Sequence, residues 1–132
     1  ALQMLMSHRW HVVDALPLTA DLFPYRSYIA ASKGEFTVAK DQYARLRTGW
    51  FSDRSACYLA AGRPVITQET GFSKFLPTGQ GLFGFATMEE ILMATEEIES
   101  DYAGNCRAAE EIAKEFFSAE KVIGDMMHKA GL

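Results

Sequence analysis

Residues 48–72 read TGWFSDRSACYLAAGRPVITQETGF and contain a helix start, a helix end and a strand in close succession. Ser52 and Asp53 are typical of a helix N-terminus, because such side chains accept hydrogen bonds from the first backbone N–H groups. Gly62 is typical of the residue that ends a helix. This stretch therefore predicts a compact helix over residues 54–61, followed by the short buried strand PVIT.

The segments upstream of this stretch predict a helix and a strand. Residues 35–39, EFTVA, are rich in strand-forming residues and predict a buried strand, which a polar loop over residues 40–49 follows. Residues 18–32 repeat apolar side chains at helical spacing, with Asp21 as a cap. Residues 11–15, HVVDA, form a short apolar run that is compatible with a further strand.

The downstream segments predict a loop over residues 71–81 and a strand over residues 82–85. Three helices are predicted to follow, over residues 87–100, 102–117 and 118–129. The first of these helices opens with the sequence TMEE, which fits a capping box. Helices and strands alternate through the first two-thirds of the chain. The sequence therefore predicts an α/β fold, with a Rossmann-like parallel sheet flanked by helices and a helical C-terminal tail.

The number of strands bears on how the chain is organised into domains. At 132 residues the chain has the length of one domain, and we expect a single α/β domain over residues 1–132. Only three or four candidate strands are present, fewer than a doubly wound domain usually has. We therefore expect the chain to be the C-terminal fragment of a larger two-domain protein.

Composition and charge argue against several classes of protein. No apolar run approaches the roughly 20 residues of a membrane-spanning helix, so no transmembrane segment is expected. The formal net charge of −4 argues against a nucleic-acid partner. Cys57 and Cys106 lie far apart and lack metal-ligand spacing, so we expect reduced thiols, no zinc site and a cytoplasmic location.

The charged residues are segregated along the chain. Residues 33–63 contain six basic and three acidic residues, whereas residues 89–120 contain ten acidic residues against Arg107 and Lys114. We interpret the acidic run as a solvated helical face. The basic run coincides with the predicted helix start, which gives it the stronger link to function.

This helix start indicates a site for an anion. Gly49 precedes the predicted helix, whose first turn holds Ser52, Asp53, Arg54 and Ser55. Unpaired backbone N–H groups and the helix dipole favour a phosphate there, and hydroxyl and guanidinium groups would add hydrogen-bond donors. Alternatively, Ser52 and Asp53 only cap the helix, since the carboxylate of Asp53 competes with a phosphate.

Two further features belong to the same region. Ligands of open α/β sheets gather at the carboxyl ends of the strands, which places Gly71 and Phe72 on the rim that holds the helix start. The loop after EFTVA is expected on this rim as well. Trp50 and Phe51 either stack on a nucleobase or pack beneath the loop.

The segment SACYLAAGRPVITQETGF resembles the small-residue helix, AxGxPVI turn and strand of GT-B glycosyltransferases of the group 1 or family 4 type. With SKGEFTVAK and RTGWFSDRS upstream, the resemblance covers roughly residues 25–85 and points to a bacterial branch of these enzymes. It implies the C-terminal, donor-binding part of an enzyme that transfers a sugar from a nucleotide-diphosphate sugar. The implied partners are this co-substrate and an N-terminal acceptor-binding domain. The catalytic residues stay unknown, and the fragment alone is expected to be inactive.

The resemblance and the helix-start chemistry together predict a set of donor-binding residues: Glu35, Gly49, Ser52, Asp53, Arg54, Ser55, Thr70, Gly71 and Phe72. Glu35 resembles the first acidic residue of the family's two-glutamate motif, whereas Cys57 stands at the second position, so that carboxylate is absent. The resemblance implies no metal, because no DxD-type carboxylate pair is present, and no cofactor besides the nucleotide sugar. The altered motif keeps a second interpretation open, a non-catalytic α/β nucleotide-binding or interaction module with the same scaffold.

Overall fold

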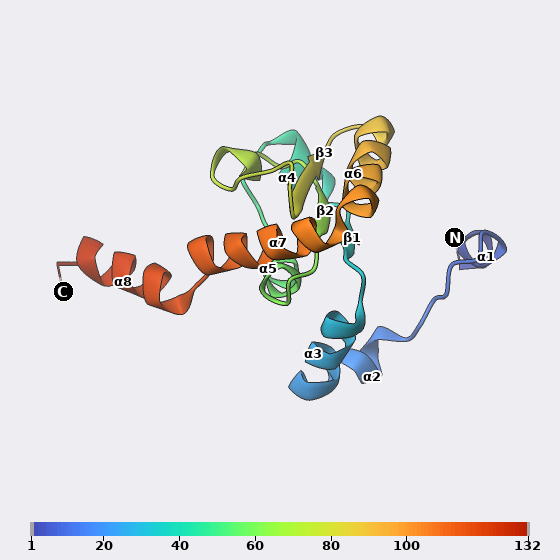
Figure 1. The fold of residues 1–132 in the computed structure, drawn as a ribbon, viewed down its shortest axis with the longest axis horizontal. Coiled ribbons are helices and arrows are strands. Elements are labelled where there is room, and N and C mark those ends of the chain that lie inside the picture. The colour runs from blue at the N-terminus through green and yellow to red at the C-terminus, as the bar shows by residue number, and fades with distance from the viewer. Residues whose placement is uncertain (1, 132) are drawn as a thin grey trace. The chain divides into compact units, whose positions relative to one another are not determined.

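A computed structural model describes residues 2–131 and divides the chain into two compact units, the first ending at Ala31 and the second beginning at Ser32. The first unit consists of three helices, α1 (Leu2–Ser7), α2 (Ala15–Thr19) and α3 (Leu22–Ala31) (Figure 1). The second unit contains all the described strands and the remaining helices.

The prediction of a strand over residues 11–15 is wrong. Residues 11–14 have no regular structure, and the Asp14 side chain accepts a hydrogen bond from Leu16 N at 3.0 Å, which caps α2. The predicted helix over residues 18–32 is confirmed as α3, with a later start. Its first turn is fixed by the Asp21 side chain, which accepts a hydrogen bond from Phe23 N at 2.9 Å.

The sheet of the second unit confirms the α/β class. Its three strands are β1 (Glu35–Thr37), β2 (Val65–Gln68) and β3 (Leu82–Phe85), paired in parallel in the order β1-β2-β3. Phe36 lies opposite Ile66, which in turn lies opposite Phe83. The result is a small parallel sheet flanked by helices. β1 and β3 begin where the sequence predicted, although β1 ends two residues earlier, and β2 lies one residue later than PVIT.

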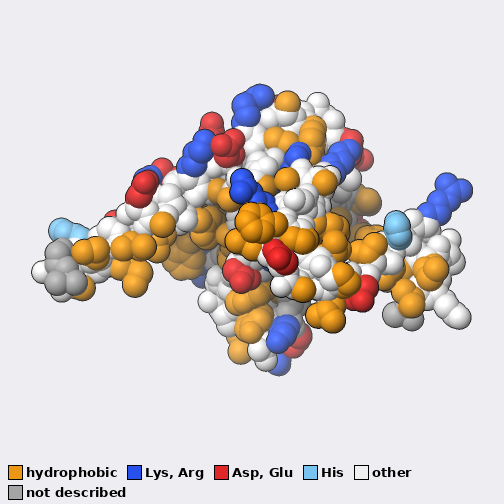
Figure 2. All heavy atoms as spheres, turned by 90° about the horizontal axis from the view of Figure 1, so that it is seen from below, with side chains coloured by type: hydrophobic (Ala, Val, Ile, Leu, Met, Phe, Trp, Pro, Cys, Tyr) orange, Lys and Arg blue, Asp and Glu red, His pale blue; other side chains and the backbone are white. Residues whose placement is uncertain are grey.

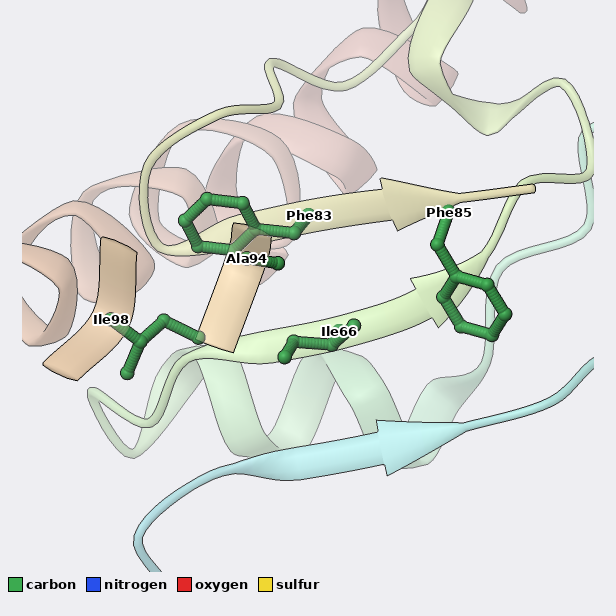
Figure 3. Close-up of a cluster of buried hydrophobic side chains, with 5 residues drawn as sticks. All are labelled: Ile66, Phe83, Phe85, Ala94 and Ile98. Atoms are coloured by element: carbon green, nitrogen blue, oxygen red, sulfur yellow. The ribbon is translucent and has the colours of Figure 1, made fainter. Parts of the chain in front are cut away.

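Successive side chains of a strand point to opposite faces of the sheet, and both faces carry apolar side chains. Different helices cover the two faces. On one face, Ile66, Phe83 and Phe85 pack against Ala94 and Ile98 of α6 (Met88–Ser100) (Figure 3). The Phe36 ring continues this face toward the sheet edge, where it stacks on Phe85 with centroids 5.5 Å apart.

The opposite face carries the most fully buried apolar side chains. Val65 of β2 and Leu82 of β3 are 0% exposed, as are Leu59 and Ala109 of the helices that contact these strands. These helices are α5 (Asp53–Ala60) and α7 (Tyr102–Phe116), which also pack on each other. Since α5 lies directly on the sheet, its first turn is held at a fixed place near the ends of β1 and β2.

Two segments predicted as loops contain short helices. Residues 40–49 include α4 (Asp41–Arg45), and residues 71–81 include the 3-10 helix η1 (Phe72–Lys74). An ion pair between Asp41 and Arg45, one turn apart with N···O 3.3 Å, accompanies α4. Elements of three to five residues are too short to show a hydrophobic period, which explains why sequence patterns miss them.

The helical tail is confirmed, and it consists of α6, α7 and α8 (Ala119–Lys129). Thr87 and Glu90 form the predicted capping box, and the hydrogen bonds that Glu90 accepts from Ala86 and Thr87 lower the pKa of its carboxyl group. Residues of α8 stay unburied, and Figure 2 shows hydrophobic side chains along this helix. None of the helices within residues 2–131 is long and apolar enough to cross a membrane.

Candidate functional site

The first turn of α5 is the centre of the candidate site. Ser52 precedes the helix with extended backbone, so the predicted helix start is confirmed. Its side chain is buried and makes no capping hydrogen bond; instead, Asp53 Oδ1 accepts from Arg54 N at 2.8 Å. The remaining N–H groups of a first helical turn have no partners within the helix and are suited to an anion.

Arg54 extends from this turn to β1. Its Nε donates to Glu35 Oε1 at 2.5 Å, and its Nη2 donates to Thr37 Oγ1 at 2.7 Å. The Glu35 side chain is only 5% exposed, whereas the Arg54 side chain is 48% exposed. The guanidinium is thus held from the side of the sheet, on a side chain that is about half exposed to solvent.

Two loops lie together at the carboxyl ends of the strands, as the sequence predicted. Gly49 N donates to Thr70 O at 2.8 Å, and Thr70 Oγ1 donates to Trp50 O at 2.6 Å. Gly71 has a φ of +98°, and a Cβ there would lie 3.0 Å from Arg47 O, so this crossing requires a glycine. The structure therefore brings Gly49, Thr70 and Gly71 into one loop cluster.

The side chains of two other predicted site residues lie in the interior. Phe72 is 1% exposed and packs against Phe51, with ring centroids 5.4 Å apart, and over Gly84 of β3. Ser55 is 0% exposed, and its Oγ has no hydrogen-bond partner among the described residues. Phe72 supports the site by packing, and only its backbone and that of Ser55 belong to the loop and helix start.

The aromatic pair before α5 packs on protein rings. Trp50 stacks on Tyr43 of α4, with centroids 5.1 Å apart and planes at 13°. Phe51 packs on Phe72 and also stacks on Phe117, with centroids 5.6 Å apart. Of the two roles that the sequence left open for this pair, packing is the one the structure shows.

Sequence reasoning missed Thr37. A signal for it was present, since Thr37 follows Glu35 by two positions and residues at this spacing in a strand share a face. Thr37 is buried and lies in the register opposite Thr67, on the face that α5 covers. Its hydroxyl contacts the guanidinium of Arg54, so it belongs to the site.

Cys57 lies one turn after Asp53 and within the field of the site's carboxylates. Burial raises the pKa of its thiol most, and the negative charges of Asp53 and Glu35 raise the pKa further. Cys57 as a whole is exposed, so its thiol is only partly desolvated at the surface. The position that the resemblance gives to a second glutamate is therefore close to Glu35 and already electronegative.

This environment predicts slow alkylation of Cys57, because the thiolate is the reactive form and a raised pKa leaves less of it near pH 8. In a Cys106→Ser background, Asp53→Asn is expected to lower the pKa and speed the reaction with iodoacetamide about twofold to fivefold. Glu111→Gln, the same charge change on exposed α7 surface, is the control and leaves the rate unchanged. An unchanged rate in Asp53→Asn would contradict the proximity of the two side chains.

No group of three or more His, Cys, Asp or Glu side chains within residues 2–131 is placed to hold a metal ion. Comparisons with protein-family models, with curated proteins and with solved structures found no match. The class that the fold and site define is thus an α/β protein with a small parallel sheet, whose polar residues meet at one rim.

Proposed function

We propose that the second unit is the donor-nucleotide-binding part of a GT-B glycosyltransferase, built on a Rossmann-like sheet. The observation that carries the proposal is the guanidinium of Arg54 in the first turn of α5, which β1 holds on a half-exposed side chain. The loop cluster of Gly49, Thr70 and Gly71 supports it. One of its loops leads into α5 and the other follows β2, at the sheet edge where ligands of parallel α/β sheets bind. The resemblance of the segment over residues 48–72 supports it independently.

In this proposal the diphosphate of a nucleotide sugar binds at the start of α5. Backbone N–H groups and the helix dipole hold the phosphate oxygens, while Arg54 donates charge-assisted hydrogen bonds. During transfer these donors stabilise the negative charge that develops on the departing nucleoside diphosphate. The carboxylate of Glu35 pairs with the guanidinium, and Asp53 adds a second negative charge to the same helical turn, so we expect the binding to be weak.

The proposal assigns the acceptor site and any catalytic base to an N-terminal domain of a longer protein. The 132-residue chain would then bind the donor nucleotide without transferring a sugar. Cys57 and Cys106 are free thiols in the structure, and we propose a cytoplasmic setting in which both stay reduced.

Calorimetric titration with uridine, guanosine, thymidine and adenosine diphosphates tests this function. We expect the chain to bind at least one of them, and Arg54→Ala to weaken that binding about tenfold to a hundredfold, as loss of hydrogen bonds to a charged group requires. Arg107→Ala removes the same charge from exposed α7 surface and is expected to bind like the native chain. Binding to none of the four nucleotides, or unchanged binding by Arg54→Ala, would contradict the proposal.

A second candidate function is a non-catalytic nucleotide-binding or interaction module. The observation that favours it is Cys57, which occupies the place of the family's second glutamate in an environment that keeps the thiol protonated. The two candidates differ in whether a protein that contains this chain and an N-terminal domain releases nucleoside diphosphate from a nucleotide sugar. Release favours the transferase, whereas nucleotide binding without release favours the module.

A further inference from the structure

Two neighbouring side chains of β1 hold one guanidinium. The carboxylate of Glu35 and the hydroxyl of Thr37, here called the Arg54 clamp, contact the Nε and Nη2 atoms of Arg54. Both come from the same face of the strand, and α5 lies on that face. Because two different groups bind two different nitrogens, the clamp fixes the plane of the guanidinium and not only its position.

Stability alone does not explain this clamp. The Glu35 side chain is only 5% exposed, and its Oε2 has no hydrogen-bond partner among residues 2–131. A buried carboxylate with an unsatisfied oxygen costs free energy, and well-packed apolar residues at such positions are often equally or more stabilising. The clamp therefore keeps a costly group in the sheet, which is typical of residues that a function requires.

Orientation of an arginine before a ligand binds is such a function. A long, exposed side chain loses rotamer freedom when it binds, and a side chain that is already held loses less. The gain is largest for a planar guanidinium that must match the oxygens of a phosphate. Arg54 satisfies both conditions, since it is held at two nitrogens and is still half exposed.

We propose that Glu35 and Thr37 are positioning residues, which hold the Arg54 guanidinium in the orientation that binds a phosphate of a nucleoside diphosphate. This inference rests on the proposed function and adds Thr37 to the site. Thr37 carries the sharper test, because its removal changes no charge, whereas removal of Glu35 also removes a repulsive charge beside the phosphate.

The test is calorimetric titration of the full chain with the nucleoside diphosphate that binds the native protein. Thr37→Val keeps the shape of the side chain and removes the hydrogen bond to Nη2, and we expect about tenfold weaker binding, equal to about 1.4 kcal/mol. Thr37→Ser restores the hydroxyl and is expected to bind like the native chain. In an Arg54→Ala background, Thr37→Val is expected to have no further effect, which a purely structural role would not predict.

Arg54→Lys provides a second measurement that does not depend on how Thr37→Val folds. It keeps the charge and loses the two-nitrogen geometry, so we expect at least tenfold weaker binding at an unchanged melting temperature. Native affinity in Arg54→Lys or in folded Thr37→Val overturns the clamp while the proposed function stands. Equal loss from Thr37→Val with and without Arg54 also overturns it. A native chain that binds no nucleoside diphosphate overturns the proposed function first, and the clamp with it.

Discussion

Gly81→Ala is expected to destabilise the second unit by about 3 kcal/mol or more, and so to remove much of its stability. Gly81 has a φ of +73°, and a Cβ at this position would lie 2.4 Å from Ala109 N and 2.9 Å from Ala109 Cα. Both atoms belong to the backbone of α7, which cannot move aside without leaving the sheet. The free energy of unfolding, measured by urea titration with circular dichroism, checks this expectation.

Gly79→Ala is the matched control for that experiment. Gly79 lies two residues earlier in the same loop and also has a positive φ, +105°, but nothing lies within 4 Å of the Cβ position. It is therefore expected to cost only the backbone strain, about 1–2 kcal/mol. The difference between the two variants isolates the contact with α7, and equal losses would show that α7 does not approach Gly81 this closely.

The strands and long helices of the second unit could be predicted because each has a local signal that its tertiary environment reinforces. PVIT and EFTVA are rich in strand formers, and each overlaps a strand. β2 is buried as predicted, whereas β1 is only partly buried, because Phe36 is 49% exposed between buried Glu35 and Thr37. Thr87 and Glu90 begin α6 by side-chain hydrogen bonds within four residues, which sequence alone can specify. The prediction of a strand over residues 11–15 failed because no neighbouring strand pairs with this apolar run, and Asp14 caps a helix there.

The site could be predicted in its backbone and less well in its side chains. Glycine is typical of positions where the backbone needs a positive φ, and Gly49 and Gly71 both have one. The structure places their loops together. The role of Phe72 could not be derived, because it depends on which strand lies beside which helix. The spacing from Glu35 indicates that Thr37 shares its strand face, but not that Thr37 contacts Arg54. Phe72 fills the space over Gly84, and Thr37 contacts a residue that follows it by 17 positions.

Asn105 connects three elements that determine where β3 and α7 lie. Its side chain is 0% exposed, and Oδ1 accepts from Gly81 N at 2.8 Å. Nδ2 donates to Asp101 O at 2.9 Å and to Glu97 O at 3.3 Å, so one amide joins the end of α6, the start of α7 and the entry to β3. Both ends of this amide are needed, since one accepts from a backbone N–H and the other donates to backbone carbonyls.

Asn105→Asp is expected to cost about 3 kcal/mol or more near pH 7, although the shape of the side chain hardly changes. The new carboxylate oxygen would face two carbonyl oxygens in a buried place, so the pKa of Asp at this position would rise above its unfolded value of about 3.9. The unfolded state then ionises first, and the stability loss grows as pH rises above that value and shrinks as pH falls below it.

Asn105→Ala separates the charge from the lost hydrogen bonds. It removes the same contacts without introducing a titratable group, so its loss, about 2–3 kcal/mol, is expected to be independent of pH when each measurement is referred to the native chain at that pH. Urea titrations at about pH 4 and pH 7 check both variants, because this interval spans the range in which an unfolded Asp ionises. A pH-independent loss in Asn105→Asp would mean that water reaches residue 105. The junction of α6, α7 and β3 would then be open, and the tight approach of α7 to Gly81 could not hold either.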